Sequence, residues 1–234
     1  MLIGQMGYQA RSPWADYIQL DVCGKSVAEV CQQWETRPSE RVILHGDWTK
    51  KGASENDIGE RWYAYVEMIR ALKLKTHILG ITLHPPSRRQ WSLSSFLEIC
   101  CLIENETNVP VFVENRSDSS RWFSSIDEIL RGSESVRMTI DLPQLWISCR
   151  YDNSLFLSVC EQLQKKSIGE LHIANARRVN GRTYVGRKLN DGEIWIEDAL
   201  QLLSHVPLGT LEILGGATTF ASEQQQLRSM LGGV

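Results

Sequence analysis

Short apolar segments alternate with helix-like segments along the chain, and this alternation constrains the fold more than any other feature. Several of the apolar segments are nearly continuous hydrophobic runs, as expected for parallel strands that are covered on both faces. They span residues 2–6, 17–22, 41–46, 77–84, 109–114, 136–141, 169–174 and 209–214. Because helical patterns separate them, we expect right-handed βαβ units that build one parallel sheet.

The segments between these strands carry apolar residues at helical spacing. In the clearest one, residues 56–74, Ile58, Trp62 and Val66 fall on one face of a helix. Further helices are expected over residues 26–34, 92–103, 124–130, 153–163, 194–203 and 220–230. Only the first connection, residues 7–15, is too short for a regular helix. The pattern predicts an α/β fold, a single (β/α)8 TIM barrel with a short or missing first helix, and a doubly wound open sheet is the alternative.

The composition is that of an ordinary globular protein, with 42% hydrophobic and 23% charged residues. No low-complexity linker divides the chain, so we expect residues 1–234 to form one domain. The net charge of −3 disfavours wrapping by nucleic acid, although a local basic patch is compatible with it. No apolar run approaches the roughly 18 residues of a membrane-spanning helix, so no membrane partner is expected.

The six cysteines contain no CxxC pair, and most of them fall in helix-like apolar patterns. This usage indicates reduced, buried thiols and a cytoplasmic location. The first residues also lack the basic and apolar segments of a signal peptide. The oligomeric state is left open by the sequence, and a homo-oligomer is compatible with it.

Polar residues of metal-binding type recur at or just after the ends of six predicted strands. They are His45, His84, Glu114, Asp141, His172 and Glu212. The carboxyl ends of barrel strands meet at one mouth, so these side chains are expected to converge there. His, Asp and Glu suit divalent Mn, Mg, Zn, Co or Fe, and a cation would offset the repulsion between several carboxylates in one cavity. Taken alone, Glu114 is more simply interpreted as a helix cap or as the residue where a strand leaves the core for solvent. The repetition of the pattern at six strand ends favours a metal site instead.

These residues, taken as an ordered set, resemble the xylose isomerase-like TIM barrels, which include sugar and sugar-phosphate isomerases, epimerases and endonuclease IV. The resemblance implies that one divalent metal ion is held by Glu114, Asp141, His172 and Glu212. It also implies that Glu114 and Glu212 move a proton on and off carbon. Arg178 stands at the offset of an arginine that contacts substrate in the epimerase branch.

The sequence departs from this family at positions that matter for metal number. His45 and His84 resemble the histidines of a second metal in endonuclease IV-like proteins, and otherwise they would contact substrate. Gln144 stands where a histidine would bind either a third metal or the substrate. Gly186 and Lys188 stand where that third metal would find its other ligands, so a trinuclear zinc site is not expected.

Cations are concentrated in the segments expected to line the mouth, although the whole chain is acidic. They are Lys50, Lys51, Arg88, Arg89, Arg177, Arg178, Arg182, Arg187 and Lys188. Gly181, Gly186 and Gly192 would let the last of these segments move as a lid. For a single residue, a solvated loop charge is the simpler interpretation. The cluster as a whole predicts an anionic substrate, and Trp48, Trp91 and Trp146 either stack on sugar faces or anchor loops.

Three functions follow from these observations. The first is a divalent-metal-dependent isomerase or epimerase that acts on a sugar, polyol or sugar phosphate by proton transfer through a metal-stabilised enediolate. The second is an endonuclease IV-like metal-dependent phosphodiesterase, which the acidic charge and the missing third site disfavour. The third is a catalytically inactive barrel that binds metal or sugar, and the fold alone cannot separate the three.

Overall fold

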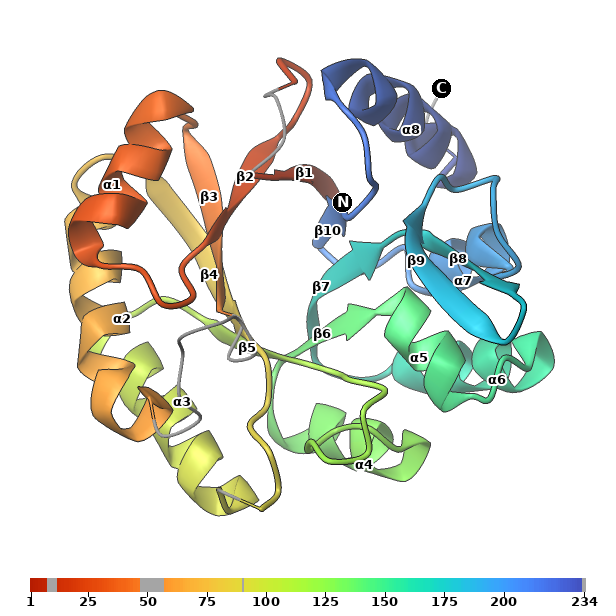
Figure 1. The fold of residues 1–234 in the computed structure, drawn as a ribbon, viewed down its shortest axis with the longest axis horizontal. Helices are drawn as coiled ribbons and strands as arrows, with labels where there is room; N and C mark the ends of the chain where they lie inside the picture. Colours follow the sequence, from red (N-terminus) through yellow and green to blue (C-terminus); the bar gives the residue numbers. More distant parts are fainter. Residues whose placement is uncertain (8–11, 47–56, 90, 233–234) are drawn as a thin grey trace.

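The computed structural model describes residues 1–7, 12–46, 57–89 and 91–232. Eight parallel strands close into a barrel in the order β1, β10, β7, β6, β5, β4, β3, β2 (Figure 1). Their bounds are β1 Leu2–Met6, β2 Tyr17–Asp21, β3 Arg41–Gly46, β4 His77–Leu83, β5 Val111–Glu114, β6 Met138–Asp141, β7 Ile168–Ile173 and β10 Leu208–Leu211. Each predicted strand overlaps one of these, and the predicted (β/α)8 barrel is confirmed.

Helices surround the barrel on its outside (Figure 1). They are α1 Val27–Thr36, α2 Asp57–Lys73, α3 Leu93–Thr107, α4 Ile126–Ser135, α5 Leu142–Ser148, α6 Asn153–Leu163, α7 Ile196–Leu202 and α8 Ala217–Met230. All but α5 match a predicted helix. Gly7 and residues 12–16, the described part of the connection between β1 and β2, contain no helix, as predicted. No helix in the described ranges has both the length and the apolar character needed to cross a membrane.

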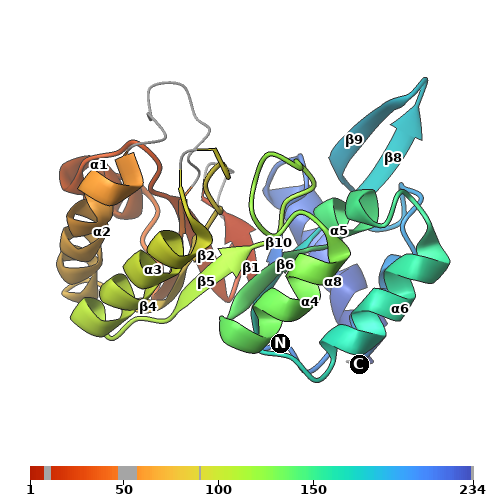
Figure 2. The same cartoon turned by 90° about the horizontal axis from the view of Figure 1, so that it is seen from below.

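A two-stranded antiparallel hairpin, β8 (Asn175–Val179) and β9 (Arg182–Arg187), follows β7 and projects from the barrel (Figure 2). The sequence predicts a glycine-hinged loop here, and the structure shows a hairpin instead, with a register shift between Asn175 and Arg177. Asn180 and Gly181 form its turn with φ angles of 50° and 76°. Positive φ at both central residues is what a tight two-residue hairpin turn requires, so the turn closes without strain at Gly181.

The interior of the barrel is filled in layers, because alternate residues of each strand point inward. Two positions before each predicted site residue lies another interior side chain. Four of these are polar and buried, namely Thr82, Thr139, Glu170 and Thr210. Apolar side chains from Tyr17, Ile43, Phe112 and Leu208 pack together in the same interior. The barrel is therefore a packed core that supports its mouth from below.

Phe112 explains why glycine stands at two interior positions. A Cβ atom at Gly80 would lie 2.5 Å from the Phe112 ring, and one at Gly169 would lie 2.3 Å from it. Real Cβ contacts are longer than this, so only glycine lets β4 and β7 close around the ring. A larger core lies between the barrel and the helices, with Trp146, Phe96 and Phe156 among its fully buried side chains.

Candidate metal centre

Glu114 is the hub of a buried cluster at the carboxyl ends of the strands. Its Oε2 atom lies 3.0 Å from Nε2 of His45, 2.9 Å from Nε2 of His84 and 3.3 Å from Nδ1 of His172. The three histidines belong to three different strand ends, since β3 contains His45, β7 contains His172, and His84 directly follows β4. Only 1% of Glu114 is exposed, so this carboxylate at the end of β5 does not mark the exit of the strand into solvent.

The remaining predicted ligands complete the cluster. Nδ1 of His172 also lies 3.3 Å from Oε1 of Glu212, which directly follows β10. The ligand atoms of Glu114, Asp141 and His172 lie within 4.8 Å of one another. The same holds for two further groups, His45 with His84 and Glu114, and His45 with His172 and Glu212. The structure thus brings together all six residues that the sequence pattern singles out.

His172 is oriented as a metal ligand would be. Its Nε2 atom lies 3.0 Å from Nε2 of Gln19 and 3.3 Å from Oε2 of Glu170. Its Nδ1 atom is buried and has no hydrogen-bond partner among the described residues, although Glu114 and Glu212 lie beside it. Histidines that bind metals commonly place one ring nitrogen on the ion and fix the other on a carboxylate. This orphaned nitrogen shows that the residues present fit a divalent metal ion.

Glu170 is held rigidly beneath His172 by hydroxyl groups of the polar interior layer. Thr82 and Thr210 each donate to it over 2.6 Å, and Thr139 donates over 3.2 Å. Because the carboxylate is fully buried, these hydrogen bonds replace its lost hydration. The network fixes the position of the carboxylate, and the carboxylate in turn limits rotation of the His172 ring.

The carboxyl groups of the cluster repel one another. Burial raises the pKa of Asp141 to about 6, and the charge of Glu114 adds to the rise. Burial also raises the pKa of Glu212, and Asp141 and Glu114 act in the same direction. Burial alone would raise the pKa of Glu114, but the charges of His84 and His172 outweigh it and hold that pKa well below its usual range. A bound cation would relieve this repulsion.

Arg116 joins the cluster, and the sequence pattern did not identify it. Its Nη1 atom lies 2.8 Å from Oε1 of Glu114 and 3.3 Å from Nε2 of His84. Gln19 and Glu170 were missed as well. The period of two along a strand could have found both, since Gln19 lies inside β2 and Glu170 lies two positions before His172. Arg116 follows its strand and carries no such signal.

Asp141 is positioned by its neighbours. Asn115 accepts a hydrogen bond from the Asp141 backbone N–H over 2.7 Å and donates to the Asp141 carbonyl over 3.2 Å. The Asp141 carboxylate caps α5 by accepting from the backbone N–H of Gln144 over 2.7 Å. The side-chain oxygen of Gln144 accepts from the backbone N–H of Ser117 over 3.0 Å. Gln144 therefore lies beside the centre and ties the loop after β5 to α5.

The predicted substrate-binding cations Arg178 and Lys188 lie at the hairpin, and both are exposed. The Arg178 guanidinium lies over the Tyr151 ring, 4.2 Å from its centroid, and its backbone N–H donates to Glu193. Within the described ranges, neither cation forms a hydrogen bond or ion pair with the six clustered residues. Their role in substrate binding stays a prediction.

Other predicted rim residues have structural partners. Arg88 forms a two-fold ion pair with Glu128 and stacks on Trp122, and Arg187 pairs with Asp191. Trp146 is buried in the core, which excludes stacking on a sugar, while Trp91 packs against the core partly buried. Trp48, Lys50 and Lys51 lie outside the described residues.

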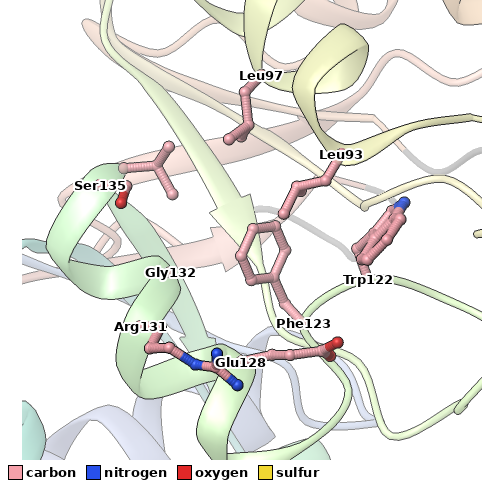
Figure 3. Close-up of a pocket in the computed structure, with 9 residues that line it drawn as sticks. Leu93, Leu97, Trp122, Phe123, Glu128, Arg131, Gly132 and Ser135 are labelled. Atoms are coloured by element: carbon pink, nitrogen blue, oxygen red, sulfur yellow. The ribbon is translucent and has the colours of Figure 1, made fainter.

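An apolar groove of about 330 Å³ lies away from this centre, on the outside of the barrel between α3 and α4 (Figure 3). Leu93 and Leu97 of α3 face Gly132 and Ser135 of α4 across it, and Phe123 closes one side. The six clustered residues do not line it. The groove is therefore separate from the candidate metal centre.

No family model and no curated protein matches the chain. Solved structures match it over nearly its full length. The IOLI protein with a binding zinc atom matches with a TM-score of 0.70 and 11% identity, over 99% of this chain and 98% of the other. A xylose isomerase domain protein from Alicyclobacillus acidocaldarius subsp. acidocaldarius matches with a TM-score of 0.63 and 11% identity, over 98% and 97%.

Endonuclease IV from Thermus thermophilus is also similar, with a TM-score of 0.57 and 11% identity, over 93% of this chain and 99% of the other. At such identities a likeness establishes the fold and leaves the activity to the residues of the site. The chain has the fold that xylose isomerase-like TIM barrels share with endonuclease IV.

Proposed function

We propose that the protein is a divalent-metal-dependent isomerase or epimerase of a sugar, polyol or sugar phosphate. The observation that supports this most directly is the convergence of three carboxylates on His172 at the barrel mouth. Glu114 and Glu212 each lie 3.3 Å from its Nδ1 atom, and Asp141 belongs to the same ligand group. Mn, Mg, Zn or Co suits this set of oxygen and nitrogen ligands.

The ion would be held by Glu114, Asp141, His172 and Glu212. A bound ion would supply Lewis-acid chemistry, which stabilises negative charge on neighbouring substrate oxygens. The protein's own part is to hold these ligands. Glu170 and Gln19 fix the His172 ring, and Asn115 fixes the backbone of Asp141.

Glu114 and Glu212 would move the proton at the substrate carbon beside a carbonyl group. The two carboxylates come from β5 and from the end of β10, and both border the same histidine nitrogen. The Glu212 side chain is 25% exposed, whereas that of Glu114 is 1% exposed. Glu212 is thus the carboxyl that a substrate entering from solvent reaches first, and Glu114 would act from the inner side through Oε1, the oxygen that Arg116 contacts.

Substrate recognition would use the remaining predicted residues. His45 and His84 contact Glu114, and Gln144 lies beside Asp141. Arg178 and Lys188 are exposed cations of the hairpin segment next to β7 and would attract a phosphate or carboxylate group.

Deuterium incorporation tests the proposal. The metal-loaded protein would be incubated in deuterated water with a panel of ketoses, aldoses and their phosphates, and the products followed by NMR. We expect deuterium at the carbon beside the carbonyl, and its loss in Glu212→Gln, whose metal content is measured alongside because Glu212 is also a proposed ligand. Asp141→Asn and His172→Ala should lose metal without unfolding. Turnover without label would refute proton transfer and point to an internal hydride shift.

A metal-dependent phosphodiesterase is the second candidate, and one observation favours it. His45, His84 and Glu114 form a ligand group of their own beside the first. Two ions roughly 3.5–4 Å apart are the usual arrangement for phosphodiester hydrolysis. Incision of a duplex oligonucleotide with one abasic site, dependent on His84 and on two ions per chain, would favour this candidate over the isomerase.

A further inference from the structure

Arg116 contacts two of the three residues that would hold a second metal ion. The ligand group of His45, His84 and Glu114 would need nitrogen atoms of both histidines and an oxygen of the glutamate. Nη1 of Arg116 lies 3.3 Å from Nε2 of His84 and 2.8 Å from Oε1 of Glu114. A guanidinium is always charged at any pH where the protein folds, so this corner of the cluster already contains a cation.

The position of Arg116 also limits what Glu114 can do. A carboxylate that bridges two ions uses one oxygen for each. Here Oε2 faces the three histidines, while Oε1 is engaged by Arg116 in a charge-assisted hydrogen bond. Oε2 is therefore the oxygen left for a single ion. It also faces His172, which forms a ligand group with Glu114 and Asp141.

We propose that Arg116 replaces the second ion and makes this a one-metal centre. The inference rests on the proposed metal site and goes beyond it, because it assigns the stoichiometry to a single side chain. Arg116 offsets the charge of Glu114 from the His84 side and repels a divalent ion there. The single ion is held on the other side, by Glu114, Asp141, His172 and Glu212. A one-metal centre agrees with the isomerase and disagrees with two-ion hydrolysis.

The test is the number of ions per chain, measured without any substrate. Chelator-treated protein is loaded with Mn²⁺, dialysed and analysed by elemental analysis, and its electron paramagnetic resonance spectrum is recorded. We expect one ion and an uncoupled spectrum for the parent. Arg116→Ala and the more conservative Arg116→Gln should each bind two ions, with the spectrum of a spin-coupled pair. Arg116→Lys keeps the charge and should return the count to one.

Two further variants locate the effect. His84→Ala added to Arg116→Ala should reduce the count from two ions to one, because the second ion needs His84. Arg131→Ala is the matched control, since Arg131 is an exposed arginine on the outer surface of α4 that hydrogen-bonds only to the Asp127 carbonyl among described residues. It should bind one ion like the parent.

Each measured count of ions supports or overturns the role of Arg116, the metal site, or both. Two ions in the parent would overturn the role of Arg116 and leave the metal site standing. One ion in both Arg116→Ala and Arg116→Gln would overturn it as well. No ion in the parent would overturn both the metal site and this inference. If Arg116→Ala fails to fold, the parent count and Arg116→Gln still decide the question.

Discussion

Glu170 should control the metal affinity of a centre to which it contributes no ligand. Glu170→Gln removes the negative charge 3.3 Å from Nε2 of His172 and puts an N–H donor among hydroxyl groups that now donate to the carboxylate. With the ring less firmly held, the Nδ1 atom is no longer kept pointing at the ion. Loss of such a supporting carboxylate typically weakens metal binding about 10- to 100-fold, equivalent to about 1.4–2.8 kcal/mol.

The same substitution also affects folding. Glu170 accepts hydrogen bonds from Thr82, Thr139 and Thr210 inside the barrel, where it is fully buried. Hydroxyl groups can rotate to accept as well as donate, so part of the network would re-form around glutamine. One unsatisfied buried donor costs about 1–3 kcal/mol, and we expect the free energy of unfolding to fall by that amount.

Isothermal titration calorimetry with Mn²⁺ would measure the affinity, and urea unfolding the stability. Glu223→Gln is the matched control. Glu223 is another buried carboxylate, but it accepts from the backbone N–H of Leu189 and has no contact with His172 among the described residues. It should lose stability and keep its metal affinity. An unchanged dissociation constant in folded Glu170→Gln, or an equal weakening in the control, would refute the reasoning.

Arg178→Ala should raise KM for a phosphorylated or carboxylated substrate roughly ten- to a hundred-fold at low salt and by less at high salt. Its metal content should stay unchanged. If the variant and the parent have equal kinetics, Arg178 is only a solvated surface residue. Gly169→Ala should lower the free energy of unfolding by about 1–3 kcal/mol because its Cβ atom meets Phe112, and Phe112→Leu should recover part of the loss in urea titrations. Burial alone would raise the pKa of Glu128, but Arg88 and the Ser124 backbone hold it below its usual value. The stability that this ion pair contributes is therefore fully present above the pKa of Glu128 in the unfolded chain, and it is lost as the pH falls through the pKa of Glu128 in the folded protein. Arg88→Ala should lower the free energy of unfolding by about 0.5–1 kcal/mol at pH 7, and this difference from the parent should disappear in acid.

The strands and most helices could be predicted because each is a continuous pattern bounded by polar residues. The site ligands could be predicted because they end strands, and the ends of parallel strands meet in space whatever the loops do. In α5, Leu142 begins the helix directly after β6, and Asp141 serves both as strand end and as helix cap. No loop separates the two elements, so the sequence offered no boundary.

The hairpin was missed for a different reason. Its Asn180–Gly181 pair is a strong hairpin signal, but the flanking strands are mostly exposed and rich in arginine, so they lack the apolar alternation that marks a strand in the sequence. Arg116 could not be predicted at all. Its contact with His84 joins residues from two different loops, and only folding brings them to 3.3 Å.

The pairing of a site residue with an interior residue two positions earlier constrains how this chain can diversify. One residue inserted at the start of β7, before Glu170, would turn both Glu170 and His172 away from the barrel interior at once. Insertions after the strands leave that register intact. Changes in length among descendants of this chain should therefore accumulate in loops such as residues 115–125 and at the tip of the hairpin, while β5, β6 and β7 keep their lengths. New substrate preferences would arise around an unchanged set of ligands.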